Sequence, residues 1–336
     1  MRFKSKLSQC TNSNHYDIIY FVHTLGGKIL RKLVTILSLC VLISCSTAEE
    51  EKLDETYHIY TTVYPLQYFV ERLGGNDVKV STIYPPGADS HTYEPTTKTM
   101  TELAKADAFF YFGKVLEPFA ESVAHALDDQ HVRFIELGSH EELFKQSLER
   151  DHSEHLDDGH AHGDHDPHIW LDPLRALTLA SILKEELILV IPERKQEIED
   201  NFNILKSELI ELDEQYRTTL KNKKDKTILV SHAGYGYWEE RYGIKQLAVN
   251  GVNNSAEPSQ ADLIHLIEEA HEHHLSYMVF EQNISDSISL KIQSEMGIHA
   301  AHIHNLAVRT ESDIEKKEDY FSLMRQNLKV LNLVTK

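Results

Sequence analysis

Short runs of apolar residues alternate along the chain with longer stretches in which apolar residues recur every three or four positions. The first pattern predicts buried strands and the second predicts helices that cover them. In the first part of the chain, the predicted strands are 57–63, 78–84, 108–112 and 132–137. The helices predicted between them are 65–73, 97–105 and 116–127. Strands separated by helices of this length indicate parallel sheets with right-handed crossovers.

The same alternation returns after residue 226. The predicted strands of this part are 227–231, 246–249, 276–281 and 298–303. Its predicted helices are 235–242, 258–274, 285–296 and 314–333. We therefore expect an α/β fold made of two similar βα-alternating domains with parallel sheets.

Two helices are predicted between these parts. Asp172-Pro173 is a favourable N-cap and first position for a helix that reaches about Val190. The next helix begins at Pro192, and its apolar residues are spaced by three or four from Ile198 to Leu220. Such a stripe predicts a helix of roughly 30 residues, or about 45 Å at 1.5 Å per residue. A helix of this length favours one strut joining two domains, with a cleft between them. The expected divisions are an N-terminal domain (57–191), a linking helix (192–222) and a C-terminal domain (223–336).

The N-terminal segment has the features of an export signal. A basic region containing Lys28 precedes an apolar run over 33–43, which is too short for the roughly 20 residues that cross a bilayer. The run ends at Cys45 in a sequence that resembles the lipobox of bacterial lipoproteins. We expect a signal peptide over 1–44, lipidation of Cys45, and a tether over 45–56 that anchors the protein to the outer face of a Gram-positive cell membrane.

A signal peptide normally begins at its basic region. Gly26-Gly27 can be encoded by bases that resemble a ribosome-binding site. We therefore expect translation to start near Ile29 or Leu30, which makes residues 1–28 a mis-extended start.

Composition narrows the possible ligands. The chain carries 53 acidic against 34 basic residues and a net charge of −19, so we expect no nucleic-acid binding and an attraction for cations. Its cysteines are Cys10, Cys40 and Cys45, so any metal bound further along must be held by His, Asp or Glu. Of the 21 histidines, six lie between His152 and His168.

Molecules and ions that bind to open parallel sheets lie beyond the carboxyl ends of the strands. Four candidate metal-binding residues occur at such places, where predicted strands end or a helix begins. They are His91, His168, His232 and Glu281. Two come from each half, so they would meet across the cleft. Three imidazoles and one carboxylate suit tetrahedral Zn²⁺. Taken singly, each has an ordinary alternative, namely a hydrogen-bonded histidine at a strand end or a glutamate that caps a helix.

Three segments carry a resemblance to a known family. Residues 84–95, 166–173 and 231–237 are similar to the signature stretches of the metal-binding (cluster A-I) solute-binding proteins of bacterial ABC importers. They are closest to the zinc branch, of ZnuA/AdcA type. The resemblance extends from about Tyr57 to the C-terminus and includes the long helix.

The resemblance implies two α/β domains, joined by a rigid helix, that bury one metal ion. It implies that His91, His168 and His232 are the imidazole ligands. It matches Glu281 to the fourth ligand, where some zinc members have a water. Manganese members have a carboxylate at the position of His232, so the resemblance favours zinc.

A loop rich in histidine precedes His168. Residues 138–167 have no apolar periodicity, and their segment 151–166 resembles the His-rich loop of zinc-branch members. The loop histidines are His152, His155, His160, His162 and His165. We expect them to bind further zinc ions weakly and reversibly. The alternative is a solvated polar loop without a metal.

The sequence therefore predicts a surface-anchored receptor, not an enzyme, that captures Zn²⁺ and delivers it to an ABC permease with its ATPase subunit. We expect a monomer that contacts the membrane only through its lipid. One alternative is a secreted zinc-dependent hydrolase, against which no His-Glu-x-x-His stretch occurs in the sequence. Others are a manganese receptor or an adhesin of the same family, but no sequence feature encodes an adhesive surface.

Overall fold

The computed structural model describes residues 56–336 except 91, 115, 146–164, 253–257 and 283–285. Contacts group Thr56–Lys336 into one compact unit. The signal segment with Cys45, the candidate ligand His91 and four loop histidines therefore lie outside the described residues. Those loop histidines are His152, His155, His160 and His162. The predicted domain boundaries stay predictions.

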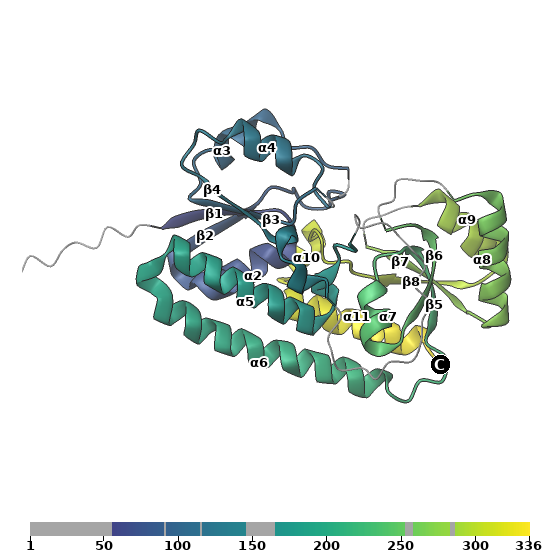
Figure 1. Cartoon of the computed structure of the whole chain (residues 1–336). Coiled ribbons are helices and arrows are strands. Elements are labelled where there is room, and N and C mark those ends of the chain that lie inside the picture. Colours follow the sequence, from purple (N-terminus) through teal and green to yellow (C-terminus); the bar gives the residue numbers. More distant parts are fainter. Residues whose placement is uncertain (1–55, 91, 115, 146–164, 253–257, 283–285) are drawn as a thin grey trace, which may run out of the picture. The chain divides into compact units, whose positions relative to one another are not determined.

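Two four-stranded parallel sheets confirm the predicted α/β class (Figure 1). The first sheet has the order β2 (Val78–Thr82), β1 (Tyr57–Thr61), β3 (Ala108–Tyr111) and β4 (Arg133–Glu136). The second has the order β6 (Lys245–Asn250), β5 (Thr227–His232), β7 (Tyr277–Glu281) and β8 (His299–Ile303). Each half thus places its first strand inside the sheet and its second at an edge. Below, "first half" means β1 to α5, and "second half" means β5 to α11.

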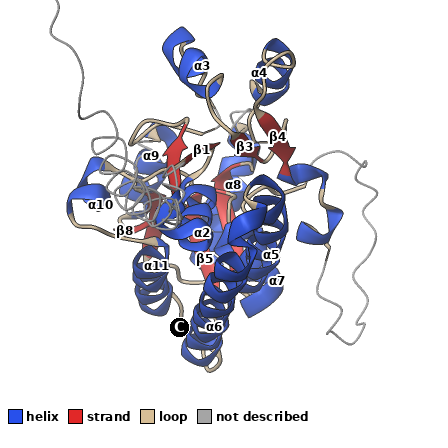
Figure 2. Cartoon of the chain, turned by 90° about the vertical axis from the view of Figure 1, so that its left-hand side faces the viewer, coloured by secondary structure: helices blue, strands red, loops and turns tan. Residues whose placement is uncertain are grey.

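Helices cover both faces of the first sheet, with α3 and α4 on one side and α2 and α5 on the other (Figures 1 and 2). The helices of the first half are α2 (Tyr64–Gly74), α3 (Thr97–Leu103), α4 (Ala120–Ala126) and α5 (Pro173–Val190). The second half contains α7 (Gly236–Tyr242), α8 (Gln260–Glu272), α9 (Ser287–Met296), α10 (Glu311–Glu315) and α11 (Tyr320–Val334). Within the described ranges, none of the helices combines the length and apolar character needed to cross a bilayer.

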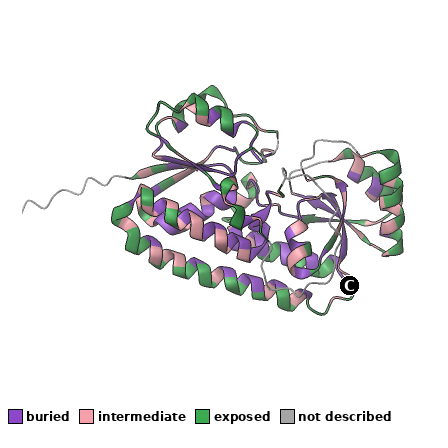
Figure 3. Ribbon diagram, viewed as in Figure 1, coloured by how far each residue is buried: buried purple, intermediate pink, exposed green. Residues whose placement is uncertain are grey.

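The predicted long helix is α6 (Lys195–Leu220), and its apolar stripe packs as expected. It contacts α2 and α5 of the first half and α7 and α11 of the second. Its buried positions follow one side of the helix (Figure 3). The predicted start of α5 is also confirmed, because the Asp172 side chain accepts hydrogen bonds from the backbone N–H groups of Leu174 and Arg175.

The predicted single helix over 314–333 is wrong. The structure has α10 and α11 instead, separated by a turn in which Lys317 has a φ of 56°. Asp319 begins α11 with a capping box, in which its side chain accepts from Ser322 N and the Ser322 hydroxyl accepts from Asp319 N. No apolar residue lies between Ile314 and Tyr320, so the apolar spacing is interrupted at the turn and the break leaves a signal in the sequence. The predicted loop 138–167 also differs, since 3₁₀ turns cover Leu137–Ser139 and Glu141–Leu143.

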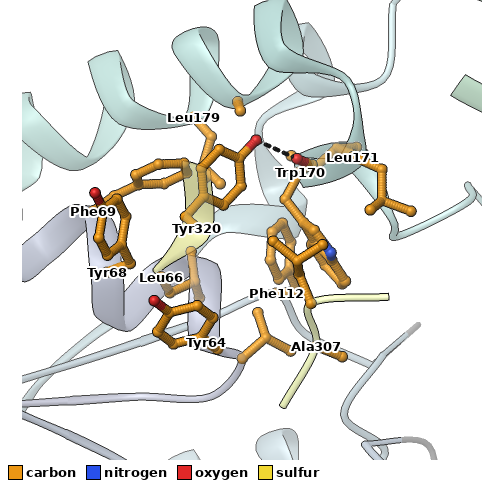
Figure 4. Packing of buried hydrophobic residues seen from close by; sticks show 14 of the residues in the cluster. Tyr64, Leu66, Tyr68, Phe69, Phe112, Trp170, Leu171, Leu179, Ala307 and Tyr320 are labelled. Carbon is orange, nitrogen blue, oxygen red and sulfur yellow. Dashed lines mark hydrogen bonds between the residues drawn. The ribbon is translucent and has the colours of Figure 1, made fainter. Parts of the chain in front are cut away.

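One hydrophobic core contains side chains from both halves (Figure 4). Trp170, before α5, is fully buried, and its carbonyl oxygen accepts a hydrogen bond from Tyr320 Oη of α11 at 2.6 Å. Trp238 of α7 donates from Nε1 to the carbonyl oxygen of Leu171 at 2.6 Å. The 3₁₀ turn Ile169–Leu171, which follows His168, is therefore fixed by two donors from the second half.

Glu117 is a fully buried carboxyl group in the loop between β3 and α4. Its Oε2 accepts a hydrogen bond from Gly113 N at 2.7 Å, which closes the loop. Gly113 has a φ of 104°, a region that favours glycine. Burial raises the pKa of Glu117 to about 8, although the Gly113 hydrogen bond opposes the shift. Among the described residues, the ionisable groups that interact with its charge include Glu136, Tyr84 and Tyr111.

We predict that Glu117→Gln removes part of the pH dependence of stability. The raised pKa means that the folded protein binds a proton which the unfolded chain releases above its ordinary carboxyl pKa. The free energy of unfolding therefore falls as the pH rises toward 8. Glutamine keeps the acceptor for Gly113 N and has no charge to bury. Urea unfolding measures the free energy of unfolding at pH 5 and at pH 9. Between these two values it should fall by about 2–4 kcal/mol more in the wild type than in the variant.

The matched control is Glu121→Gln, which removes an exposed carboxylate from α4. It should leave the pH dependence close to that of wild type. Equal behaviour of the two variants would contradict a raised pKa at Glu117.

Candidate metal centre

The candidate site lies at the carboxyl ends of neighbouring strands in the second sheet. His232 is the last residue of β5 and Glu281 is the last residue of β7. These strands pair in parallel, which brings their ends to the same sheet edge. Each side chain is nearly inaccessible to water, at 2% exposure or less. The structure therefore places both side chains together at one edge of the second sheet.

His232 and Glu281 form a buried pair. His232 Nδ1 lies 2.8 Å from Glu281 Oε1, and His232 Nε2 lies 2.8 Å from the carbonyl oxygen of Val252. Glu281 Oε1 also accepts from Tyr235 Oη at 3.1 Å, while Oε2 accepts from Asn305 Nδ2 at 2.6 Å. Both nitrogens of His232 thus face acceptors, as a doubly protonated imidazole requires.

Electrostatics agree with an ion pair. Burial lowers the pKa of His232, but the hydrogen bond and negative charge of Glu281 outweigh burial and raise this pKa above its ordinary value. Burial raises the pKa of Glu281, but His232 outweighs burial and lowers it. In this pair a proton lies between Nδ1 and Oε1, where a bound cation would contact both groups.

His168 reaches the same place from the first half. Its Nδ1 lies 2.7 Å from Asp166 Oδ1, and its backbone N–H donates to that oxygen at 2.9 Å. The backbone carbonyl of Asp166 accepts from Tyr237 Oη of α7 at 2.7 Å. Asp166 thus sets the tautomer and the rotation of His168, with Nε2 on the far side of the ring. The centroids of the His168 and His232 rings are 5.1 Å apart.

The structure therefore brings together three of the four predicted ligands. The fourth, His91, lies outside the described residues. Among the described residues, no group of three or more His, Cys, Asp or Glu side chains has the arrangement needed to hold a metal ion. In this state Glu281 contacts His232, and His168 contacts Asp166. The complete ligand set stays a prediction.

The described loop histidine and two aromatic residues near the site have other surroundings. His165 of the predicted loop is exposed and stacks on Phe144, with ring centroids 4.7 Å apart. Tyr235 and Trp238 are buried in the core, but Tyr235 also contacts the site carboxylate. Two groups that hold the site were missed in the sequence: Asp166 as the partner of His168, and Asn305. An Asp two positions before a candidate histidine is a usable signal, whereas Asn305 is neither a histidine nor a carboxylate, the residue types that mark candidate metal ligands.

Comparison with known proteins gives consistent matches. The family model described as ZnuA, zinc-uptake complex component A periplasmic, matches residues 59–333. The zinc-binding lipoprotein AdcA of Streptococcus pneumoniae (strain ATCC BAA-255 / R6) is 31% identical over 300 residues, or 89% of this chain. The chain spans 60% of the length of that relative. The high-affinity zinc uptake system protein ZnuA of Bacillus subtilis (strain 168) is 27% identical, over 82% of this chain and 86% of that protein.

Solved structures share the fold. The Zn(II)-bound ZnuA-like domain of Streptococcus pneumoniae AdcA matches with a TM-score of 0.67 and 30% identity, covering 83% of this chain and 99% of that one. A mutant structure of the laminin-binding adhesin Lmb from Streptococcus agalactiae matches with a TM-score of 0.70 and 24% identity, with the same coverage of both chains. At this identity the second match shows the fold alone.

We predict that Gly234→Ala weakens divalent-cation binding about tenfold, or about 1.4 kcal/mol. A Cβ atom at Gly234 would lie 3.2 Å from His232 Nδ1 and Cε1, and 3.6 Å from His168 Cδ2. The methyl group would crowd the His232 imidazole, whereas its contact with His168 is an ordinary van der Waals contact, and it would displace the His232 nitrogen that faces Glu281. Competition with a chromophoric chelator measures the affinity, and thermal unfolding checks that the fold is kept.

Gly251→Ala is the control, because a Cβ at Gly251 would meet nothing within 4 Å. It should bind the cation as wild type does. Equal affinity of both variants would mean that the cation does not lie between these imidazoles.

Proposed function

Because the chain belongs to the ZnuA family of zinc-uptake components, we propose that it is an extracytoplasmic receptor that captures Zn²⁺ and delivers it to an ABC-type permease. The observation that carries the proposal is the meeting of His168 with the His232–Glu281 pair. One imidazole comes from the first half, while the second imidazole and the carboxylate come from the second half. Such a set suits capture of a cation between two parts of one chain.

We propose His91, His168, His232 and Glu281 as the ligands of one tight zinc site. Neutral imidazoles and a carboxylate are donors that Zn²⁺ accepts in four-coordinate sites. The chain before His91 supports the assignment, since Ser90 is buried and its carbonyl oxygen accepts from Tyr84 Oη at 3.2 Å. The same loop is linked to the second half, because Gly87 N donates to the carbonyl oxygen of Arg309 at 3.0 Å.

When the site captures zinc, the ligand side chains lose a proton and the ion loses its bound water. The proton between His232 Nδ1 and Glu281 Oε1 must leave before both atoms bind zinc, so binding releases protons and weakens at low pH. His232 Nε2 then stays a donor to the Val252 carbonyl oxygen, and His168 Nδ1 stays a donor to Asp166. These outer contacts hold each ring in one tautomer and one orientation.

Receptor function agrees with the site better than hydrolysis does. A catalytic zinc keeps one position open for water, whereas the proposed set fills all four. The sequence contains no His-Glu-x-x-His stretch. Adhesion is not proposed, since the likeness to the laminin-binding protein extends to the fold alone.

The proposal includes the surroundings of the receptor. Lipidation of Cys45 would anchor a monomer to the outer face of the membrane, where it meets the permease and its ATPase subunit. The loop 151–166 would hold further zinc ions weakly, because it carries several imidazoles and carboxylates. Release at the permease requires work on the protein, since a tight site empties slowly.

We predict one-to-one tight binding of Zn²⁺ to wild-type protein that lacks the segment before Cys45, and much weaker binding of Mn²⁺. Nitrogen ligands favour zinc, whereas Mn²⁺ prefers oxygen ligands and a higher coordination number. His232→Glu should narrow the gap between the two affinities by about 10- to 100-fold, or about 1.4–2.8 kcal/mol. Competition titrations of both ions against both proteins measure the gap.

An unchanged gap in the His232→Glu variant would mean that His232 is not a ligand. Absence of tight zinc binding by the wild type would overturn the receptor proposal. Hydrolytic activity that depends on the bound zinc would favour the enzyme alternative.

A second prediction tests the anchor. Cys45→Ala should abolish labelling by a fatty-acid analogue and release the protein from the cell. Cys40→Ala removes a cysteine within the predicted apolar run and should leave labelling unchanged. Persistent labelling of the Cys45→Ala variant would overturn the proposed anchor without affecting the zinc site.

A further inference from the structure

Asn305, which follows β8, has a side chain with a fixed orientation. Its Nδ2 donates to Glu281 Oε2 at 2.6 Å. Its Oδ1 accepts from the backbone N of Ala307 and from Gln282 Nε2, both at 3.0 Å. Because Oδ1 faces two donors, the amide cannot be turned around without losing both bonds and placing its oxygen against the carboxylate.

The backbone of Asn305 links the two sides of the site. Its N–H donates to Gln282 Oε1 at 2.9 Å, and its carbonyl oxygen accepts from Trp170 Nε1 at 2.8 Å. Trp170 lies two residues after His168, and the centroids of the two rings are 5.5 Å apart. Asn305 thus contacts the carboxylate of Glu281 directly and the indole beside His168.

We propose that Asn305 is a positioning residue of the metal site, which fixes Glu281 through Oε2 and directs Oε1 toward the cation. The inference rests on the proposed function. Glu281 Oε1 is shared by His232 Nδ1 and Tyr235 Oη, so the hydrogen bond from Asn305 to Oε2 sets the rotation of the carboxylate. A carboxylate held in this way binds a cation through its other oxygen and loses little freedom on binding.

A neighbouring asparagine provides a control that distinguishes the proposed role of Asn305 from a purely structural one. Asn327 of α11 holds the same chain segment, since its Nδ2 donates to the carbonyl oxygen of His304 and its Oδ1 accepts from His304 N, both at 2.7 Å. Neither of these two hydrogen bonds involves Glu281. Asn327→Ala therefore removes two hydrogen bonds one residue away while keeping the donor to Oε2.

The experiment is a double-mutant cycle on the protein that lacks the segment before Cys45. The variants are Asn305→Ala, Glu281→Ala and the double variant with both substitutions. Zinc affinity is measured by chelator competition, and the visible spectrum of bound Co²⁺ reports the ligand geometry. We expect Asn305→Ala to weaken zinc by about 10- to 100-fold, as loss of an outer-shell partner does. In the Glu281→Ala background the same change should have no further effect, because the two residues act through one contact. Asn305→Ala should also alter the Co²⁺ spectrum.

Asn327→Ala should lower the unfolding temperature and keep the zinc affinity within about threefold. Three results would each overturn the inference: unchanged zinc affinity in Asn305→Ala, additive losses of affinity in the cycle, or an equal loss of affinity in Asn327→Ala. The proposed function would still stand in each case, provided that the wild type binds zinc tightly. If Asn305→Ala does not fold, Gln282→Ala tests the same contact, because it removes a partner of both the Asn305 backbone N and Oδ1. A loss of affinity with an altered Co²⁺ spectrum supports the inference, and no loss overturns it.

Discussion

The chain segment after β8 accepts hydrogen bonds from the first half at three places, and the candidate site depends on these contacts. Trp170 Nε1 donates to the carbonyl oxygen of Asn305, Tyr64 N to that of Ala307, and Gly87 N to that of Arg309. A buried backbone carbonyl without a partner costs about as much as a lost hydrogen bond. The contacts therefore constrain how the second half meets the first, in addition to the shared hydrophobic core.

This constraint matters because the two halves supply different parts of the site. His168 lies before a 3₁₀ turn whose carbonyl oxygens accept from Trp238 and Tyr320 of the second half. His232 and Glu281 come from strand ends of the second sheet itself. The 5.1 Å between the two imidazole centroids therefore results from contacts made well outside the site. Removing the donor of Trp238 or of Tyr320 would leave a buried carbonyl oxygen without a hydrogen bond and would make the distance between the two imidazoles less well fixed.

Local pattern predicted most elements because their signals are local. Asp172-Pro173 marks the start of α5, and the spacing from Ile198 to Leu220 marks α6. The predicted helix over 314–333 spanned a gap in the apolar spacing between Ile314 and Tyr320, and the positive φ at the break occurs in Lys317 and not in a glycine. Strand order was not predicted, since periodicity does not say which strands pair. The position of His232 and Glu281 at strand ends follows from the sequence, whereas the ligand set stays a prediction and His91 lies outside the described residues.

Burial explains why the site needs supporting groups as well as ligands. A charged pair taken out of water is stable only when its remaining donors and acceptors are satisfied. Val252, Tyr235 and Asn305 supply those contacts to His232 and Glu281. The same contacts would remain when a cation replaces the shared proton, so these outer partners of the pair would not need to change on binding. A site prepared in this way favours tight capture, and the work of release then falls on whatever changes the contacts between the two halves.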